Sequence, residues 1–421
     1  MARLTFMGSC REIGRSAFYL EERGESILID YGVKLVDNPI FPDTVPTDGL
    51  QGIAVTHAHL DHSGGLPMLL AHDDISLFCT PATRDLSMLL LDDMYELSKA
   101  RLPFSHKDIA QVQRQCQPTA YEDTIPLGRH FEITLFNAGH IPGSAMVSVR
   151  VDGKRILFTG DFNSIETQLN AGARKNLPKH DIVVTESTYA QRVNAKREEI
   201  EDEFIQTVIE ALERGGTVLI PAFAVGRSQE IMCILERYNL PEKYTVFIDG
   251  LARKVNEVVI KHPGYIASPH SFERAVARTR IIYDDGDCLK AAKKGGIIIS
   301  PAGMLKGGPS HLYFKMLYND PRNSIVLVSF QIPGTPGAEL LAKRKVTVSG
   351  RVYEVAADVR FHHLSSHSDS EGLMDVLEKI PGDPKFYCVH GEPDSCDALA
   401  ARLGTIGRQA HVPEINEAME V

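Results

Sequence analysis

Four side chains that can bind metal ions lie within six residues: His57, His59, Asp61 and His62. They follow the apolar run 52–56, which predicts a buried strand. Histidine is the commonest metal ligand, and a carboxylate can bridge two cations. Alternate residues at a strand end share a face, so His57 and His59 can point at one position. Asp61 and His62, past the turn, can then serve a second position. A solvated polar loop does not explain four potential ligands in so short a segment.

Three later segments place one further ligand each at the end of an expected strand: His140, Asp161 and His390. Taken singly, each of these residues is an ordinary turn aspartate or surface histidine. A binuclear site, however, needs about four ligands per metal and a bridging carboxylate, which the first cluster alone cannot supply. Together with that cluster, the three residues complete such a set.

Composition limits the class of protein. The chain of 421 residues is long enough to predict two domains, and 43% hydrophobic with 24% charged residues is typical of a globular protein. The formal net charge of −10 argues against a generic nucleic-acid coat, but not against a nuclease whose cations lie in the site. The seven cysteines are scattered and odd in number, which indicates free thiols in a reducing cytoplasm. No apolar run reaches the roughly 20 residues of a membrane span, and we expect neither a signal peptide nor membrane contact.

The pattern of expected elements changes twice along the chain. Residues 1–190 contain many short alternating or β-branched runs, which predict strands. From about 191, apolar strands alternate with helices, which predicts a parallel sheet covered on both faces. Past about 345 the strand-rich pattern returns. One domain is therefore expected to be interrupted by another.

The motif His57-x-His59-x-Asp61-His62, with His140 and Gly160-Asp161, resembles the metallo-β-lactamase superfamily. Asp30, in Leu28-Ile29-Asp30-Tyr31-Gly32, matches the aspartate that this superfamily places behind its metal ligands. Three further motifs resemble the β-CASP nuclease branch: Thr185-Glu186-Ser187, Ser366-His367-Ser368-Asp369 and Val389-His390-Gly391. The resemblance covers essentially the whole chain. It is strongest to cleavage-and-polyadenylation-factor-like ribonucleases of prokaryotic, archaeal type.

The resemblance implies an α/β protein: a metallo-β-lactamase αβ/βα sandwich with an inserted β-CASP domain. The sandwich would take residues 1–190 and 346–421, and the β-CASP domain 191–345. It also implies two Zn²⁺ per chain. The implied ligands are His57, His59 and His140 for one zinc, Asp61, His62 and His390 for the other, and Asp161 between them.

The implied activity is hydrolysis of RNA phosphodiester bonds by a hydroxide formed at two metals, as an endonuclease, a 5′-3′ exonuclease or both. Histidine at position 390 favours RNA, and single-stranded RNA is the expected substrate. His367 would donate a proton to the leaving oxygen and Glu186 would orient it; Asp61 is counted as catalytic as well as a ligand. Residues 366–369 also look like the cap of a helix starting at Ser370, and both interpretations can hold.

Four residues are candidates for holding substrate phosphate. His363 and Ser365 resemble a pocket for a terminal 5′-phosphate, which would favour an exonuclease; a buried polar pair is the alternative. Lys306, in a glycine-rich segment before a helix, and Arg227, at a helix start, could also meet phosphate. Each of these two could equally be part of a turn or cap.

Two other functions stay open. A small-molecule thioesterase or lactonase of the same superfamily would explain the metal ligands, but would leave the inserted residues without a role. A scaffold subunit of an RNA-processing complex would be expected to lose ligands, and none is missing here. A homodimer is also plausible, because the tail 412–421 is apolar enough to dock on a partner chain; it could equally pack on its own domain.

Overall fold

The computed structural model describes residues 1–71, 74–348 and 350–421. It divides into two compact units, which are treated separately: unit 1 contains residues 1–166, 171–193 and 367–421, and unit 2 contains 167–170 and 194–366. Residues 346–366, which the sequence analysis places in the first domain, cluster with unit 2. The reason is that strand β19 (Asp358–Phe361) pairs in parallel with β16 (Ser324–Leu327).

Unit 1 contains two mixed sheets. Their strand orders are β22-β1-β2-β3-β4-β5-β6 and β21-β20-β11-β10-β9-β8-β7. The first sheet comprises β1 (Arg3–Phe6), β2 (Phe18–Glu22), β3 (Glu25–Ile29), β4 (Leu50–Ala54), β5 (Leu77–Cys79), β6 (Cys116–Pro118) and β22 (Ala418–Glu420). The second comprises β7 (Thr124–Leu127), β8 (Phe131–Asn137), β9 (Ala145–Val151), β10 (Lys154–Phe158), β11 (Ile182–Glu186), β20 (Lys385–Val389) and β21 (Ala410–His411).

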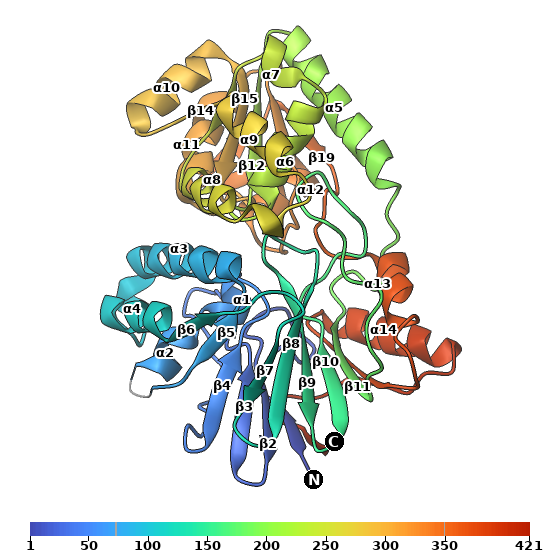
Figure 1. The fold of residues 1–421 in the computed structure, drawn as a ribbon. Helices are drawn as coiled ribbons and strands as arrows, with labels where there is room; N and C mark the ends of the chain where they lie inside the picture. Colours follow the sequence, from blue (N-terminus) through green and yellow to red (C-terminus); the bar gives the residue numbers. More distant parts are fainter. Residues whose placement is uncertain (72–73, 349) are drawn as a thin grey trace. The chain divides into compact units, whose positions relative to one another are not determined.

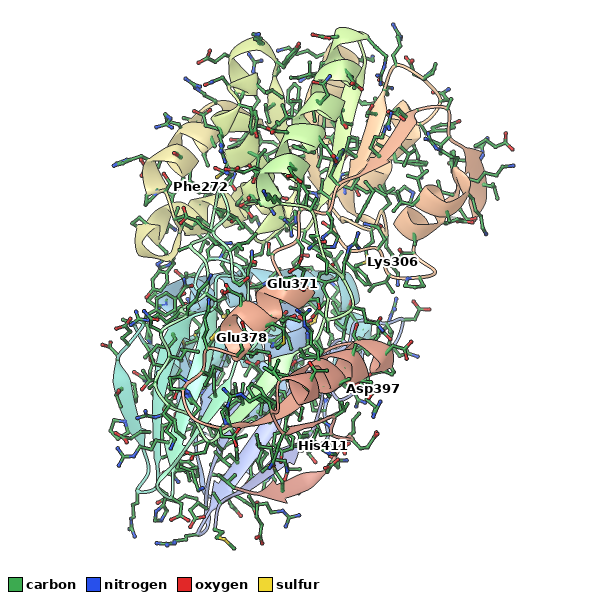
Figure 2. The ribbon with its side chains drawn as sticks, turned by 90° about the vertical axis from the view of Figure 1, so that its right-hand side faces the viewer. Phe272, Lys306, Glu371, Glu378, Asp397 and His411 are labelled. Atoms are coloured by element: carbon green, nitrogen blue, oxygen red, sulfur yellow. The ribbon has the colours of Figure 1, made fainter. Side chains whose placement is uncertain are left out.

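The two sheets pack face to face, and helices cover their outer faces (Figure 1). Large apolar residues such as Phe6, Phe18 and Phe158 alternate along the strands and fill the space between the sheets. Figure 2 labels one exposed acid on each of α13 and α14, Glu371 and Asp397. The helices of unit 1 are α1 (Leu60–Ser63), α2 (Leu66–Leu70), α3 (Pro81–Ser98), α4 (His106–Gln115), α13 (Ser370–Leu377) and α14 (Pro393–Thr405), with the 3₁₀ turn η1 (Lys99–Arg101). The predicted αβ/βα sandwich is confirmed.

The strands of unit 1 end where the expected ligands begin. β4 ends three residues before His57, β10 ends three residues before Asp161, and β20 ends directly before His390. β10, β11 and β20 are consecutive parallel neighbours, so their carboxyl ends lie at one edge of the sheet. The order of the strands therefore gathers side chains that are far apart in the sequence.

The C-terminal tail packs on its own unit. β22 pairs antiparallel with β1, with Arg3 opposite Glu420, and the amide of Val421 donates to the carbonyl of Ala2 at 2.9 Å. Figure 1 accordingly shows the two ends of the chain near each other. Of the two interpretations of the tail, the structure supports packing within the chain.

Unit 2 is built on a parallel sheet with the order β14-β13-β15-β12-β16-β19. Apolar clusters lie on both faces of this sheet under helices, as the predicted β-CASP architecture requires (Figure 1). Its strands are β12 (Thr217–Ala222), β13 (Val246–Ile248), β14 (Thr279–Ile281), β15 (Gly296–Pro301), β16 and β19, with a separate hairpin of β17 (Lys345–Val348) and β18 (Arg351–Glu354). Its helices are α5 (Arg197–Glu213), α6 (Arg227–Arg237), α7 (Leu240–Lys243), α8 (Leu251–Lys261), α9 (Pro269–Ala277), α10 (Asp285–Lys294), α11 (Gly308–Leu317) and α12 (Pro336–Lys343), with η2 (Pro263–Tyr265). Within the described residues of either unit, no helix is both long and apolar enough to cross a membrane.

The short segment 167–170 belongs to unit 2 although its neighbours on both sides belong to unit 1. The carboxylate of Glu230 on α6 accepts hydrogen bonds from the Thr167 hydroxyl at 2.9 Å and from the Leu169 amide at 2.8 Å. Arg197 pairs with the same carboxylate and offsets the cost of burying its charge. This buried anchor explains why the segment clusters with unit 2.

Candidate metal centre

The first group of potential ligands comprises His57, His59, His140 and Asp161, whose ligand atoms all lie within 4.8 Å of one another. His57 Nε2 lies 3.6 Å and His140 Nε2 lies 3.8 Å from Asp161 Oδ2, and His59 Nδ1 lies 3.1 Å from His140 Nε2. Four ligands at about 2.0–2.1 Å from a tetrahedral zinc are separated from one another by roughly 3.4 Å. The three observed separations, from 3.1 to 3.8 Å, lie on both sides of that value.

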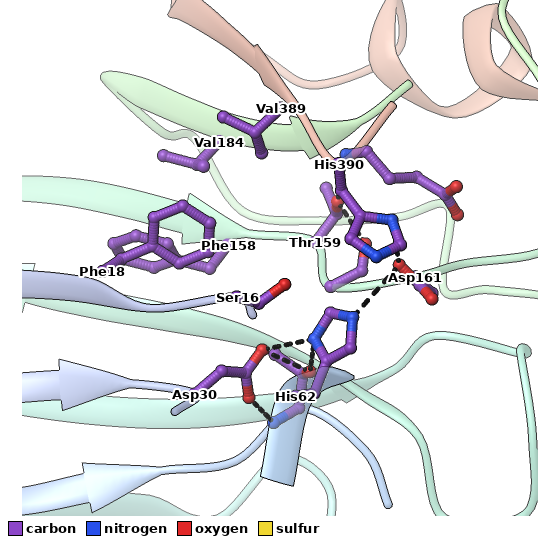
Figure 3. Close-up of a pocket in the computed structure, with 13 residues that line it drawn as sticks. Ser16, Phe18, Asp30, His62, Phe158, Thr159, Asp161, Val184, Val389 and His390 are labelled. Atoms are coloured by element: carbon purple, nitrogen blue, oxygen red, sulfur yellow. Dashed lines mark hydrogen bonds and ion pairs between the residues drawn. The ribbon is translucent and has the colours of Figure 1, made fainter. Parts of the chain in front are cut away.

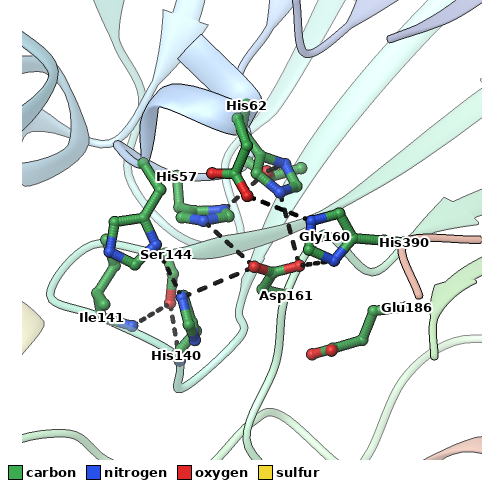
Figure 4. A network of polar contacts seen from close by, with 12 residues as sticks. His57, His62, His140, Ile141, Ser144, Gly160, Asp161, Glu186 and His390 are labelled. Carbon is green, nitrogen blue, oxygen red and sulfur yellow. Dashed lines mark hydrogen bonds and ion pairs between the residues drawn. The ribbon is translucent and has the colours of Figure 1, made fainter. Parts of the chain in front are cut away.

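The second group comprises Asp61, His62, His390 and the same Asp161. His62 Nε2 lies 3.5 Å and His390 Nδ1 lies 3.1 Å from Asp161 Oδ1, and His390 Nε2 lies 3.4 Å from Asp61 Oδ2. Figure 4 shows Asp161 between the rings of both groups. Its Oδ2 faces the first group and its Oδ1 the second, which is the arrangement of a bridging carboxylate.

The donor atoms fit metal ions. His57 Nε2, His62 Nε2 and Asp161 Oδ1 are buried and have no hydrogen-bond partner among the described residues. Burying a polar atom without a hydrogen-bond partner costs free energy of folding, so such atoms are expected to bind an ion or a water molecule. Nitrogen and carboxylate oxygen donors in two sets of four, with one shared carboxylate, suit two zinc ions.

Asp30 orients one of these ligands from behind. Its Oδ2 accepts a hydrogen bond from His62 Nδ1 at 2.7 Å, which leaves Nε2 as the free ring nitrogen aimed at Asp161. Thr56 holds Asp30 in turn, since its amide donates to Oδ1 at 2.7 Å and its hydroxyl donates to Oδ2 at 2.8 Å. Asp30 adopts a left-handed conformation with φ of 57°, which aspartate tolerates better than most residues.

Burial and charge act differently on the two groups. Burial lowers the pKa of His57 and of His59, so both rings are neutral, the form that binds metal. Burial also opposes the charged form of His62 and of His390, but Asp161 and the other acids outweigh it and raise the pKa of both rings. Burial would raise the pKa of Asp61, yet the hydrogen bond from His390 and the charge of His62 prevail and lower it. The second group therefore favours protonated rings more than the first group does.

A third group lies beside the other two and contains Asp161, Glu186 and His367. His367 Nδ1 lies 3.0 Å from Glu186 Oε2, and the amide of Phe162 donates to Glu186 Oε1 at 2.7 Å. Burial alone would lower the pKa of His367, but the negative charges of Glu186 and Asp161 raise it to about 9. A charged imidazole held by a buried carboxylate can give up a proton. His367 also lies just before the helix cap, which is made by Asp369, whose side chain accepts from the amide of Gly372.

A small cavity of about 10 Å³ lies behind the ligands, between the two sheets (Figure 3). Polar residues such as Ser16 and Thr159 line one side of it, and Phe18, Phe158 and Val184 line the other. Its volume is that of about one water molecule.

The predicted phosphate contacts lie in unit 2, where the structure brings some of them together. Arg227 Nη2 donates to the hydroxyl of Ser366 at 3.1 Å, next to Ser365, whose carbonyl accepts from Arg197 at 3.2 Å. The ring of His363 lies 6.0 Å from that of Phe361. Lys306 is exposed on the loop before α11 (Figure 2). Their role in binding phosphate stays a prediction.

Three family models match successive parts of the chain: the metallo-beta-lactamase superfamily over residues 11–194, the Beta-Casp domain over 228–340, and the Zn-dependent metallo-hydrolase RNA specificity domain over 352–413. A curated relative from Saccharolobus solfataricus, named RNase aCSPSF2, is 34% identical over 98% of this chain and 84% of its own length. The chain belongs to the β-CASP branch of the metallo-β-lactamase superfamily. The predicted family is confirmed, and so is the prediction that this β-CASP chain is a metal-dependent hydrolase.

Further β-CASP relatives and a solved structure agree with this assignment. A Methanocaldococcus jannaschii protein named probable RNase MJ4 is 31% identical over 99% of this chain and its own full length. The transcription termination factor FttA of Pyrococcus abyssi is 35% identical over 95% of this chain and 68% of its own length. A crystal structure of a protein of unknown function from Enterococcus faecalis V583 covers 99% of both chains with a TM-score of 0.62 at 15% identity, and shows the same fold.

Two supports of the β-CASP centre have no signal in the sequence. The hydroxyl of Ser144 accepts from the amides of His140 and Ile141, at 3.0 and 3.2 Å, and so shapes the loop that presents His140 (Figure 4). Thr56 clamps Asp30 as described above. Both are small hydroxyl residues beside a ligand, and only their folded surroundings distinguish them from many others.

Proposed function

We propose that the chain is a ribonuclease that hydrolyses phosphodiester bonds of single-stranded RNA with two zinc ions. The observation that carries the proposal is the placement of Asp161, with one oxygen toward each of two groups of metal ligands. The description of the matched RNA specificity domain, and the names of two relatives as RNases, support RNA as the substrate.

His57, His59 and His140 would hold one zinc, Asp61, His62 and His390 the other, and Asp161 would bridge them. Bound zinc supplies positive charge beside the phosphate and lowers the pKa of water towards neutrality. Asp30 keeps His62 in the tautomer that exposes Nε2. The neutral rings of the first group need lose no proton to bind metal.

His367 would protonate the leaving oxygen. Its Nδ1 is engaged by Glu186, so Nε2 is the atom that can carry the proton to substrate. Glu186 favours the charged ring and fixes its orientation, while its other oxygen is held by the amide of Phe162. Asp61 shares the hydrogen bond to His390 and would act as a ligand near the reacting atoms.

Arg227, Lys306, His363 and Ser365 are proposed to contact the substrate backbone. The contact between Arg227 and Ser366 places a guanidinium next to Ser365, as a pocket for a terminal phosphate would require. A 5′-3′ exonuclease needs such a pocket, whereas an endonuclease does not. The proposal therefore includes both modes, and the substrate below separates them.

The first experiment uses one RNA with a 5′-monophosphate and a label at its 5′ end, incubated with the zinc-loaded chain. Immediate release of labelled mononucleotide indicates a 5′-3′ exonuclease, and labelled fragments of intermediate length indicate an endonuclease. His367→Ala should abolish cleavage while metal analysis still finds two zinc ions. Loss of zinc in that variant would show that His367 is itself a ligand.

Absence of cleavage with zinc bound would favour the two other functions. Hydrolysis of thioesters or lactones by the same preparation would identify a small-molecule hydrolase, and inactivity on both substrate classes would favour a scaffold subunit. We also propose a cytoplasmic location, which suits seven cysteines that are all free. Light scattering of the purified chain would distinguish a homodimer from a monomer that joins an RNA-processing complex.

A further inference from the structure

One edge of the sheet of unit 2 is open. β19 is the last strand in the order β14-β13-β15-β12-β16-β19, and within the described residues no strand pairs with its outer edge. The amides of Asp358 and His362 donate to carbonyls on the side of β16, at 2.9 and 3.0 Å. Successive backbone groups of a strand alternate in direction, so those of Val359 and Phe361 point away from β16. Such an edge can hydrogen-bond one more strand.

A groove of about 760 Å³ lies between β19 and α5, both labelled in Figure 1. Its lining residues on α5 are Asp202, Glu203, Gln206, Thr207 and Glu210. Its lining residues at β19 are Arg360, Phe361 and His362. Thr207 joins the two walls, because its hydroxyl and His362 Nε2 form a hydrogen bond of 3.0 Å, and the ring of His362 lies 5.8 Å from that of Phe204. The groove is therefore preformed, and its volume is within the range of roughly 300–1,000 Å³ that is usual for binding pockets.

The wall formed by α5 is acidic. This helix contains seven acidic residues and one basic residue, and three of its exposed acids line the groove: Asp202, Glu203 and Glu210. Arg360 is the only lysine or arginine among the lining residues, and Asp358 holds it in an ion pair at 2.9 Å. Burial lowers the pKa of His362, so that ring adds no charge at neutral pH. A groove with this charge repels the phosphates of RNA and attracts a basic partner.

The two faces of β19 would sort the side chains of an added strand. His362 lies on the face that packs on α5, whereas Val359 and Phe361 pack on an apolar cluster with Leu340 of α12 on the other face. Alternate side chains of a strand point to opposite faces. Every second side chain of an added strand would therefore lie along the acidic α5, and the remaining ones would lie beside Phe361. Basic residues suit the first set and apolar residues the second.

We propose that this groove binds an extended segment of a partner protein, in which basic and apolar residues alternate, and that the segment pairs with β19 as a further strand. The N–H and C=O groups of Val359 and Phe361 would form the main-chain hydrogen bonds, and the acids of α5 would select the basic residues. The interaction needs neither zinc nor RNA cleavage, so its tests are independent of the ribonuclease function.

The first test is fluorescence anisotropy of a labelled peptide of about eight residues, in which lysine alternates with valine, added to the zinc-loaded chain. We expect saturable binding with a dissociation constant below about 1 mM, whereas a peptide of alternating glutamate and valine should not bind. Two further peptides keep the charge but carry N-methyl groups on either the lysine or the valine amides. Only one of them has its methyl groups on the edge that faces β19, so one should lose binding and the other should keep it. Equal affinity of these two peptides, or no binding of the original peptide, would overturn the proposal.

Substitutions in the groove test its charge. The combined Asp202→Asn, Glu203→Gln and Glu210→Gln variant should bind the lysine–valine peptide about tenfold more weakly, because each exposed ion pair contributes only modestly. None of the three acids belongs to a group of metal ligands, so RNA cleavage should be unchanged. Loss of cleavage with unchanged peptide binding would assign the groove to RNA and overturn the proposal.

The matched control combines Glu257→Gln, Glu273→Gln and Asp285→Asn. These three exposed acids lie on α8, α9 and α10, outside the groove, and their replacement changes the net charge by the same amount. The control should keep the affinity for the peptide. Equal weakening in both variants would show a general effect of charge and would also overturn the proposal.

Hydrogen exchange of the original chain locates the contact without any substitution. The amides of Val359 and Phe361 should exchange rapidly in the free chain and slowly with saturating peptide, whereas β16 protects those of Arg360 and His362 in both states. Unchanged exchange at Val359 and Phe361 would overturn the pairing with β19. This measurement decides the matter even where a variant does not fold.

Discussion

Replacing Gly160 by alanine should disable the metal centre through the backbone. Gly160 has a φ of 52°, and a Cβ atom there would lie 2.7 Å from Thr56 Cβ, about 0.7 Å inside ordinary van der Waals contact. Thr56 cannot swing away, because its amide and hydroxyl both hold Asp30. Either Thr56 or the adjacent Asp161 must therefore move. Metal sites tolerate ligand displacements of only about 0.2 Å.

The expected loss can be estimated and separated from a loss of stability. Displacement of groups that orient metal ligands typically lowers metal affinity about 10- to 100-fold. The left-handed conformation adds about 1–2 kcal/mol of destabilisation for any residue with a Cβ. Gly153→Ala isolates that second effect, because Gly153 has a φ of 78° and a Cβ there meets nothing within 4 Å.

The assay is competition for zinc with a chromophoric chelator, combined with thermal unfolding of both variants. Gly153→Ala should lose about 1–2 kcal/mol of stability and keep the zinc affinity of the original chain. Gly160→Ala should lose affinity as well. Equal zinc affinity in the two variants would refute the idea that close packing of Gly160 on Thr56 positions the ligands.

Two other perturbations have definite expected outcomes. Asp30→Asn should weaken zinc binding about 10- to 100-fold at the group containing His62, because the ring loses its charged acceptor. The group containing His57 should keep its affinity. Isothermal titration calorimetry should then resolve two sites of unequal zinc affinity. Burial lowers the pKa of His180 from 6.5 to about 4, so the unfolded chain binds this proton more tightly and stability must fall as the pH drops through that window. Between pH 7.5 and 5.0 the contribution of His180 is about 2 kcal/mol, so urea unfolding should show a loss of stability that is smaller by that amount in His180→Gln than in the original chain.

The two groups of potential metal ligands were predictable because their residue types and spacing are rare. Three imidazoles and a carboxylate in six residues at a strand end leave few alternatives, and the gathering of His140, Asp161 and His390 followed once their strands were recognised. Short alternating runs such as Ala145–Val151 likewise predicted strands, whereas the sandwich was implied by the family resemblance. These features depend on residues that are close together in the sequence, so they can be recognised without the structure.

Other features depend on contacts that no local pattern encodes. β19 looks like part of the first domain in sequence, but its partner is β16, and only the pairing decides its place. The sequence alone does not distinguish Glu230 from an exposed helix acid. In the structure it is buried, and its carboxylate accepts hydrogen bonds from the amides of residues 168 and 169.

Strands β11 and β20 pair directly, although the whole sequence of α5 to α12 lies between them. Closing a flexible loop of that length costs about 4–5 kcal/mol of chain entropy, from (3/2)RT ln n with n near 200. A folded unit 2 removes most of that cost in advance, because its own sheet already confines the intervening chain. Destabilising the core of unit 2 should therefore weaken zinc binding by His390 without altering any ligand. Unit 2 would then stabilise the metal centre by lowering the entropy cost of pairing β11 with β20.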